Sequence, residues 1–131
     1  MMKPPYGRIT AIDLNKGEHV WEVVNGGDGP RDHPALKGLD LPPLGTNTRA
    51  GALVTKTVLF VTEGSGRTGS ATGGGNKLRA FDKATGAVLA EFVLPDHATG
   101  VPMTYMVEGK QYVVVAIGST PAQFVALSLP S

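Results

Sequence analysis

Short runs of apolar residues alternate along the chain with segments rich in Gly, Pro, Asp and Asn. Runs such as Val58–Thr62 and Gln111–Ile117 are dominated by Val, Ile, Phe, Tyr and Thr, and no segment keeps a 3.6-residue period over several turns. β-branched and aromatic residues favour strands, whereas an amphipathic helix needs the longer period. The pattern therefore predicts an all-β protein built from short strands.

Two segments of the chain repeat each other. Arg8–Gly17 and Lys77–Gly86 share Ala, Asp and Gly at matching positions. In each copy an apolar run ends at an aspartate, Asp13 or Asp82, which can accept backbone N–H bonds, and a glycine four residues later can take a positive φ. Apolar residues then resume, so each copy predicts a β-hairpin. The expected return strands are Glu18–Val23 and Ala87–Val93.

The spacing of the copies indicates a larger repeat. A third, shortened copy is Gln123–Ser128, in which Ala126 follows Ala80 by 46 residues, whereas Ala80 follows Ala11 by 69. A period near 46 is the size of one β-propeller blade. The excess of 23 residues matches Asn25–Asn47, whose Gly and Pro content prevents a central strand. We interpret this segment as an inserted loop.

Strand candidates between the copies complete the blades. Ala52–Thr55 and Val58–Thr62 precede the second hairpin, so that four strands form one blade. The fourth strand of the last blade is expected to come from elsewhere in a closed propeller, which leaves only short, protected edges. The chain is therefore predicted to be one partial β-propeller of four-stranded antiparallel blades. Its parts are the outer two strands of one blade (6–23), the inserted loop (24–48), a complete blade (49–94) and the inner three strands of a closing blade (99–131).

The composition and charge of the chain limit the kinds of partner and chemistry it can have. The 131 residues are 41% hydrophobic, carry a net charge of +1 and contain no Cys. The Lys and Arg residues form no basic stripe, so nucleic acid is not an expected partner, and disulfide or thiolate chemistry is excluded within this chain. No apolar run reaches the roughly 18 residues that span a bilayer. Met1–Gly7 lacks a signal-peptide pattern, so a signal could only lie upstream.

Two segments resemble a known family. Tyr6–Trp21 looks like the tryptophan-docking repeat of pyrroloquinoline-quinone (PQQ) dependent dehydrogenases, and Thr99–Gly118 resembles the closing blade of the membrane-bound quinoprotein glucose dehydrogenase type. His33–Gly38 fits the same family. The resemblance implies a periplasmic, eight-bladed parent that oxidises sugars or alcohols. It also implies PQQ and a calcium ion at the propeller axis, with a quinone or a cytochrome as electron acceptor.

The chain departs from the family pattern at defined positions. Trp21 matches the docking tryptophan, which in this family packs between blades, but the second copy has Ala90 there. That interface is expected to pack differently. The catalytic Asp and the metal ligands of the family belong to earlier blades, so no catalytic or metal-binding residue is carried over. We expect this chain to contribute structural blades and part of the cofactor wall, but not the catalytic base. The chain alone is expected neither to bind PQQ or calcium tightly nor to catalyse turnover.

Two loops are candidates for cofactor contact. Asn47 and Arg49 precede the expected innermost strand of the complete blade, near the propeller axis. Arg offers a bidentate fork to carboxylates, and Asn has both donors and acceptors, so both suit a carboxylate-rich cofactor. Ser119 and Thr120 follow the second strand of the closing blade, where this family builds part of the cofactor wall. The alternative for both loops is a plain connection between strands.

A literal G-x-G-x-x-G motif occurs at Gly64–Gly69 after the strand Val58–Thr62. A dinucleotide fingerprint requires a helix that opens at the motif and receives the pyrophosphate at its N-terminus. Here the flexible segment Gly69–Asn76 leads into another strand. The motif is therefore interpreted as a long hairpin loop.

The histidines do not form a metal motif. His19, His33 and His97 have no i, i+4 partner and no Cys companion, so a zinc site is not expected. Asp96 beside His97 could in principle perform acid–base chemistry, but a turn role suits it better.

Two other functions stay open at this point. A non-catalytic PQQ-repeat scaffold of the outer-membrane assembly type also carries tryptophan-docking repeats, although Pro102–Gly118 and the insertion favour the enzyme. A free-standing β domain is the other, but a repeat unit cannot bury its apolar face alone. We therefore expect this chain to associate with the remaining blades of the parent or with itself through exposed strand edges.

Overall fold

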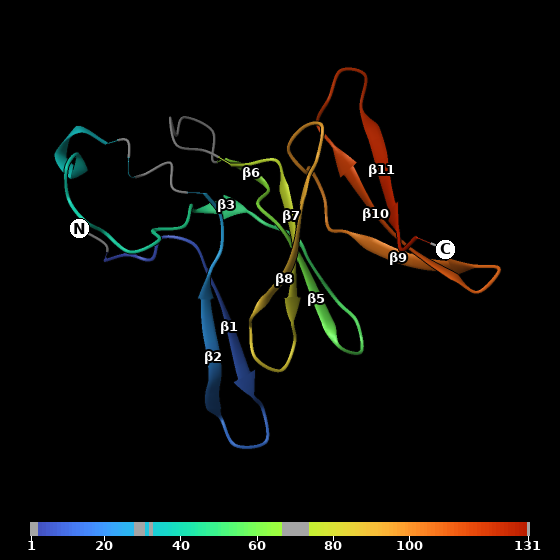
Figure 1. Cartoon of the computed structure of the whole chain (residues 1–131), viewed down its shortest axis with the longest axis horizontal. Coiled ribbons are helices and arrows are strands. Elements are labelled where there is room, and N and C mark those ends of the chain that lie inside the picture. Colours follow the sequence, from blue (N-terminus) through green and yellow to red (C-terminus); the bar gives the residue numbers. More distant parts are fainter. Residues whose placement is uncertain (1–2, 28–30, 32, 67–73, 131) are drawn as a thin grey trace.

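The computed structural model describes residues 3–27, 31, 33–66 and 74–130, and these residues form short antiparallel strands (Figure 1). A short 3-10 helix, η2 (Pro34–Leu36), lies in the long loop after the first hairpin. The strands are β1 (Arg8–Asp13), β2 (Glu18–Val24), β3 (Thr48–Arg49), β4 (Ala52–Val54), β5 (Val58–Thr62), β6 (Ser65–Gly66), β7 (Lys77–Asp82), β8 (Val88–Val93), β9 (Met103–Val107), β10 (Lys110–Ile117) and β11 (Gln123–Ser128).

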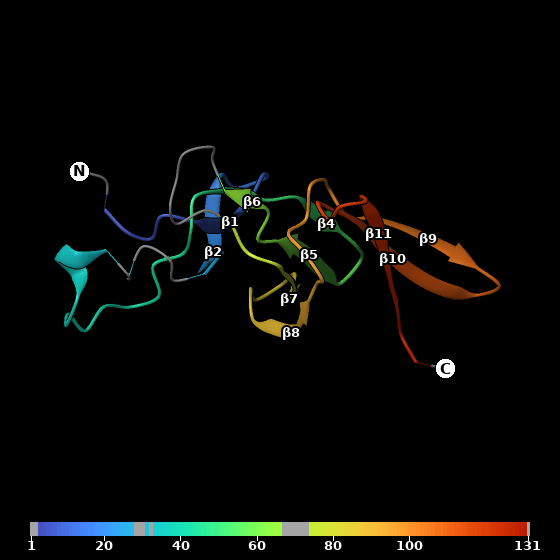
Figure 2. The same ribbon diagram turned by 90° about the horizontal axis from the view of Figure 1, so that it is seen from above.

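The described residues form three larger sheets, of two, four and three strands. β1 pairs with β2, the central sheet has the order β4-β5-β7-β8, and the last sheet has the order β11-β10-β9. All these pairings are antiparallel. The central sheet is thus a complete four-stranded blade, with the two-stranded hairpin on one side and the three-stranded sheet on the other (Figures 1 and 2). The prediction of an all-β structure is confirmed.

Aspartate turns join the two outer strands in both hairpins. The Asp13 Oδ1 atom accepts the backbone N–H of Asn15 at 2.9 Å, and the Asp82 Oδ1 atom accepts that of Ala84 at 2.8 Å. Gly17 and Gly86 have φ of 70° and 76°, a region that favours glycine. These turns have the chemistry expected from the repeat.

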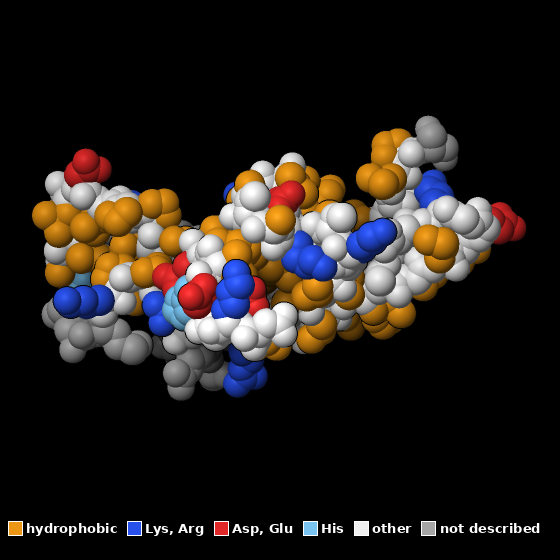
Figure 3. Space-filling model, turned by 90° about the horizontal axis from the view of Figure 1, so that it is seen from below, with side chains coloured by type: hydrophobic (Ala, Val, Ile, Leu, Met, Phe, Trp, Pro, Cys, Tyr) orange, Lys and Arg blue, Asp and Glu red, His pale blue; other side chains and the backbone are white. Residues whose placement is uncertain are grey.

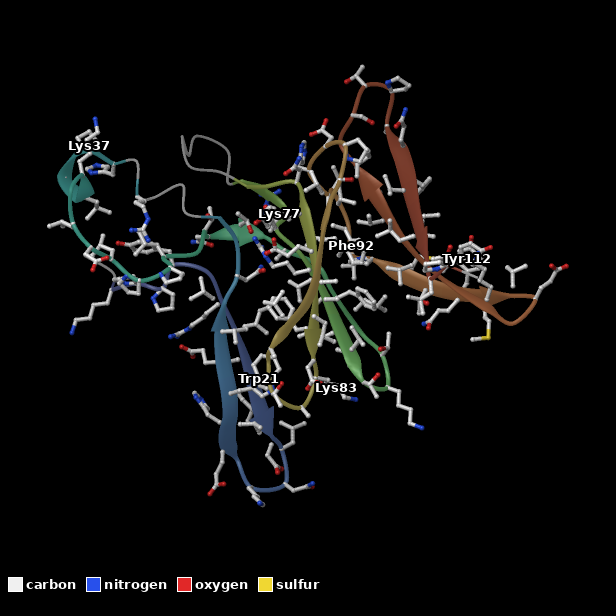
Figure 4. All side chains as sticks on the ribbon, viewed as in Figure 1. Trp21, Lys37, Lys77, Lys83, Phe92 and Tyr112 are labelled. Carbon is white, nitrogen blue, oxygen red and sulfur yellow. The ribbon has the colours of Figure 1, made fainter. Side chains whose placement is uncertain are left out.

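The first hairpin packs on the central sheet through one apolar cluster. Buried Leu59, Val61 and Phe81 contact partly buried residues of the hairpin, namely Ile9, Trp21 and Val23. The indole Nε1–H of Trp21 donates to the Lys83 carbonyl at 3.0 Å, and a Cβ at residue 86 would lie 2.7 Å from the indole ring. Figure 4 shows Trp21 directed at the turn that carries Lys83. The expected docking between blades is therefore present, and it needs a glycine at position 86.

The second interface between sheets lacks a tryptophan and uses other side chains. Its buried cluster is centred on Leu78 of β7 and Val115 of β10, which are 0% and 1% exposed. Phe92, two residues beyond Ala90 on β8, packs against this cluster (Figure 4). The phenyl ring of Phe92 supplies apolar volume that the Ala90 methyl group cannot. The second interface therefore packs differently from the first, which uses Trp21.

The inserted loop is tied at its base. The N–H of Thr46 donates to the Asn25 carbonyl at 3.1 Å, and the Thr46 hydroxyl donates to the Gly27 carbonyl at 2.7 Å. A Cβ at Gly45 would lie 2.7 Å from the same Asn25 carbonyl oxygen, so the two ends of the loop nearly touch. Because the ends of the loop are adjacent, the insertion need not disturb the blade, and the entropic cost of closing a loop rises only slowly with its length.

One small sheet was not predicted. β3 pairs with β6 in the register Thr48↔Gly66 and Arg49↔Ser65. Both strands are only two residues long, and their Gly and Asn neighbours carry no strand pattern. This small sheet joins the end of the inserted loop to the loop that follows β5.

Among the described residues, no helix is long and apolar enough to cross a membrane.

Candidate functional site

The predicted site residues lie at one end of the blades. The loops that follow β2, β5, β8 and β10 all lie at the upper end in Figure 1, whereas the turns after β1, β4 and β7 lie at the lower end. Asn47 and Arg49 belong to the upper set, and so do Ser119 and Thr120. We call this upper end the loop end. It brings the four candidates to one side of the molecule, in two different blades.

Asn47 and Arg49 are exposed at the start of the central blade. No hydrogen bond or ion pair of either side chain is formed with a described residue, so their donors are open to a ligand. Their backbone is anchored to the segment after β5. The Thr48 hydroxyl donates to the Glu63 carbonyl, and Gly64 packs directly against the Arg49 carbonyl. The side chains are therefore open to solvent while their backbone is fixed.

Ser119 and Thr120 lie in the loop between β10 and β11. The Ser119 hydroxyl donates to the Pro121 carbonyl at 2.8 Å, so its proton is used within the loop and its oxygen stays available as an acceptor. Thr120 is exposed. Among the described residues, no hydrogen bond joins this pair to Asn47 or Arg49.

Sequence reasoning missed a buried ion pair between Arg79 and Glu63, the residue whose carbonyl bonds to Thr48 of β3. The Arg79 Nη2 atom is 2.7 Å from Glu63 Oε1, with side chains that are 11% and 5% exposed. The Arg79 Nε–H also donates to Glu91 Oε1 at 2.7 Å. Burial alone would lower the pKa of Arg79, but the hydrogen bonds with Glu91 and Glu63 outweigh it and raise the pKa above its ordinary value. The available signal was Arg79 between the apolar residues Leu78 and Ala80 of β7.

His97 and Asp96 contact each other at the loop end of the last sheet. The Asp96 Oδ1 atom accepts the backbone N–H of His97 at 2.7 Å and lies 2.8 Å from His97 Nδ1. The backbone hydrogen bond, with the ring contact, lowers the pKa of Asp96. The imidazole lies against Gly118, where a Cβ would come within 2.6 Å of Nε2. The contact fits the turn role expected of Asp96.

The remaining motifs have limited structural support. In the G-x-G-x-x-G segment, Gly64 leads into strand β6 rather than a helix, and Arg67, Thr68 and Gly69 lie outside the described residues. In the part of the chain that the structure describes, no three His, Cys, Asp or Glu residues are grouped to hold a metal ion. Figure 3 shows the end opposite the candidates, where Lys and Arg are scattered and form no continuous basic surface.

Comparison with known proteins places this fold. Residues 1–113 match the family model described as PQQ, glucose/ethanol/alcohol dehydrogenase, β-propeller domain. The chain belongs to this PQQ β-propeller family. Membership confirms the resemblance expected from the docking repeat and the closing blade.

The relatives of this PQQ propeller chain are named as dehydrogenases. It is 37% identical to the glycerol dehydrogenase large subunit of Gluconobacter thailandicus, with 98% of this chain and 17% of that protein aligned. It is 34% identical to the quinoprotein glucose dehydrogenase of Escherichia coli K12, over 88% of this chain and 14% of that protein. The chain thus spans about a sixth of the length of these curated relatives.

Solved structures share the fold. The quinohemoprotein alcohol dehydrogenase of Comamonas testosteroni superposes with a TM-score of 0.55 at 26% identity, covering 85% of this chain and 12% of that protein. The quinohemoprotein alcohol dehydrogenase ADHIIG of Pseudomonas putida HK5 gives a TM-score of 0.52 at 23% identity over 86% of this chain and 12% of that protein. The sheets described above therefore correspond to part of a larger propeller.

The loop end fits a carboxylate-rich cofactor such as PQQ. Arg49 and Asn47 offer donors that no described side chain occupies, and Ser119 offers an acceptor. A guanidinium binds carboxylate oxygens with two parallel N–H bonds, which makes Arg49 the strongest of these groups. The residues present can line one side of such a site.

Proposed function

We propose that this chain forms part of the propeller of a PQQ-dependent sugar or alcohol dehydrogenase of the quinoprotein glucose dehydrogenase type. Family membership over residues 1–113 carries the proposal. The names of the relatives favour this enzyme over a non-catalytic scaffold. When bound, PQQ supplies the two-electron acceptor that oxidises a CH–OH group to a carbonyl, while the protein binds and orients it.

The chain's own contribution is part of the cofactor wall. Arg49 and Asn47 present donors to the carboxylates of PQQ, and the loop at Ser119 and Thr120 contributes from the neighbouring blade. Support comes from the common position of both loops at the loop end and from the open side chains of Asn47 and Arg49. The catalytic base, the calcium ligands and the substrate-selecting residues belong to blades outside these 131 residues.

The parent protein is proposed to be an eight-bladed, periplasmic quinoprotein. A quinone or a cytochrome would be the electron acceptor of the parent; one relative, from Xanthomonas campestris, is named a probable quinate dehydrogenase (quinone). The remaining blades of the parent are the main binding partners of this chain.

Titration with PQQ tests the cofactor wall. In the complete propeller protein, Arg49→Ala is expected to raise the dissociation constant of PQQ about tenfold or more, since a charged hydrogen bond contributes about 1.5–3 kcal/mol. Asn47→Ala is expected to have a smaller effect. Lys56→Ala, at an exposed position in the turn after β4, is the matched control and should leave the constant unchanged. Equal affinities for wild type, Arg49→Ala and Lys56→Ala would remove Arg49 from the site.

A second assay tests where the catalytic machinery lies. The purified 131-residue chain, mixed with PQQ, calcium and glucose, is expected to reduce no electron-accepting dye, because the proposed base lies in other blades. Dye reduction above the level of free PQQ would show that these residues suffice for turnover and would overturn this assignment.

A further inference from the structure

The buried pair Glu63–Arg79 lies where it can act on the cofactor wall without touching a ligand. Both side chains lie on the face of the central sheet that packs against the first hairpin. Arg79 pairs with Val61, which faces the hairpin, and Glu63 lies two residues after Val61 and so on the same face. Below them this face is apolar, with Val61 and Phe81 buried. Among the described residues, the interface between blades is thus apolar through its middle, and this buried ion pair lies toward the loop end.

Glu63 is fixed from several directions at once. Its backbone N–H donates to the Lys77 carbonyl at 2.9 Å, and its Oε2 atom accepts the Lys77 N–H at 3.3 Å. Its Oε1 atom is paired with Arg79 at 2.7 Å. A Cβ at Gly75 would collide with the carboxylate, so the neighbouring loop leaves room for it. A buried charge pair with this many bonds constrains geometry strongly.

The same residue supports the backbone of the cofactor wall. The Glu63 carbonyl accepts the Thr48 hydroxyl, and Thr48 lies between Asn47 and Arg49. Gly64, the next residue, packs against the Arg49 carbonyl. β3 is only two residues long, so its own ladder is too short to fix the position of Arg49. Thr46 and Gly51 are anchored on either side of this segment by hydrogen bonds to Asn25 and Thr62, and between them Glu63 and Gly64 supply the contacts beside Arg49.

We propose that Glu63 and Arg79 are positioning residues, which act through the Glu63 carbonyl and Thr48 to hold Asn47 and Arg49 in the geometry that binds the cofactor. The proposal rests on the proposed function for its ligand. It concerns residues that do not contact the ligand themselves, and it explains why an ion pair is buried at this end of the interface.

Two variants test the proposal in the complete propeller protein. In Glu63→Gln the amide oxygen can accept from either Arg79 or Lys77, but the amide nitrogen then faces a donor, so the carboxylate network is broken at nearly constant volume. Thr48→Val removes only the hydroxyl link and leaves the ion pair intact. Lys77→Met is the matched control. Lys77 lies on the same strand as Arg79, and the substitution removes its exposed salt bridge with Glu91 of β8 while the backbone bonds of residue 77 to Glu63 remain.

The first readout needs no cofactor. Hydrogen–deuterium exchange of the apo protein is expected to be about five- to tenfold faster over residues 46–51 in Glu63→Gln and in Thr48→Val, as for the loss of one hydrogen bond, and unchanged in Lys77→Met. Unchanged exchange in this segment for Thr48→Val would overturn the proposal, whatever the affinity for PQQ. Thr48→Val also keeps the test valid if Glu63→Gln fails to fold.

The second readout is a double-mutant cycle for PQQ affinity. Glu63→Gln is expected to weaken binding about tenfold in the wild-type background and by less than about twofold when Arg49 is already alanine, because Glu63 acts through Arg49. Additive effects would overturn the proposal. If exchange accelerates as expected but wild-type protein binds no PQQ, the positioning role stands and the proposed function fails.

Discussion

Individual side chains decide how the blades of this molecule meet. Trp21 fills the space above a glycine of the next blade and donates to a carbonyl in the same turn, so one residue supplies both apolar contact and a directional bond. Residues with this double role are the positions where a single substitution has its largest effect.

Truncation of the docking tryptophan should destabilise the first interface. Trp21→Ala is expected to lower the free energy of unfolding by about 3 kcal/mol, the lower end for large aromatic truncations, because the indole is only partly buried. Trp21→Phe keeps most of the packing and loses the hydrogen bond to Lys83, which costs about 1 kcal/mol. Urea unfolding followed by circular dichroism measures both values. Equal losses for the two variants would contradict the docking geometry.

Acid should weaken the turns that rely on ionised aspartates. The backbone N–H of Thr85, with further bonds from the Thr85 hydroxyl and Ala84, lowers the pKa of Asp82. A folded-state pKa below the unfolded value of about 4 means that the ionised form favours folding. The resulting stability is present above pH 4 and is lost as the pH falls through the lowered pKa.

The Asp82→Asn variant isolates this effect. It keeps a side-chain oxygen for the turn but cannot titrate, so it is expected to lose less stability than wild type when the pH is lowered from 7 to 3. Urea unfolding at both pH values measures the difference. Parallel losses in the two proteins would mean that Asp82 does not contribute to the acid response.

At the scale of elements, strands differ in whether one or both faces are packed: β7 buries Leu78 in the second interface and Phe81 in the first, whereas β10 packs mainly through one face. In β10 the side chains alternate, so that Val115 is 1% exposed within the second interface while Val114 lies on the opposite face and is only partly buried. The same residue type therefore occupies two environments on neighbouring positions of one strand.

These two valines form a matched pair for testing the interface. Val115→Ala is expected to lower the free energy of unfolding by about 2 kcal/mol, from two lost methyl groups and the cavity that remains, whereas Val114→Ala should cost less than about 1 kcal/mol. Thermal or urea unfolding of both variants tests the assignment of faces. A larger loss of stability for Val114→Ala than for Val115→Ala would mean that Val114, and not Val115, faces the second interface.

The strands of the blades could be predicted from sequence, and the small elements at the loop end could not. Alternation, turn aspartates and glycines recur in both hairpins, so local chemistry alone places β1, β2, β7 and β8 within about a residue of their observed bounds. β3 and β6 have no such pattern, because two-residue strands form only when tertiary contacts bring them together.

The candidate site was predictable only in its exposed part. Asn47 and Arg49 could be proposed from their place before an innermost strand, since topology alone brings that position to the loop end. The Glu63–Arg79 pair forms because the chain direction after the end of β5 brings the Glu63 carboxylate to Arg79. The loop that sets this direction has no sequence pattern from which it could be predicted. Buried polar pairs of this kind follow from the assembled fold and not from local preference.

At the scale of the whole molecule, open strands and apolar faces remain. The sheet order β11-β10-β9 leaves one edge of β11 without the outer strand that β8 provides in the central blade. Phe124 on this edge strand is 80% exposed, and Met103 on β9 is 53% exposed. Unpaired edges beside exposed apolar side chains favour association with another chain.

The chain on its own is therefore expected to associate. Sedimentation velocity of the 131-residue chain should show species larger than a monomer, and Phe124→Lys should shift the distribution toward monomer by placing a charge on the edge strand. Lys56→Ala, in the turn after β4, serves as the control. A strictly monomeric chain with a cooperative thermal transition would contradict this prediction.

The presence of one tryptophan at only one of the two interfaces has an optical consequence. Since the chain contains a single Trp, its intrinsic indole fluorescence reports on the contact between the hairpin and the central blade, and Phe92 leaves the other contact without such a signal. Repeat proteins hold their units mainly through nearest-neighbour contacts, so these units can separate at different denaturant concentrations. An emission transition that precedes the loss of far-ultraviolet ellipticity would then identify the hairpin as the first unit to detach.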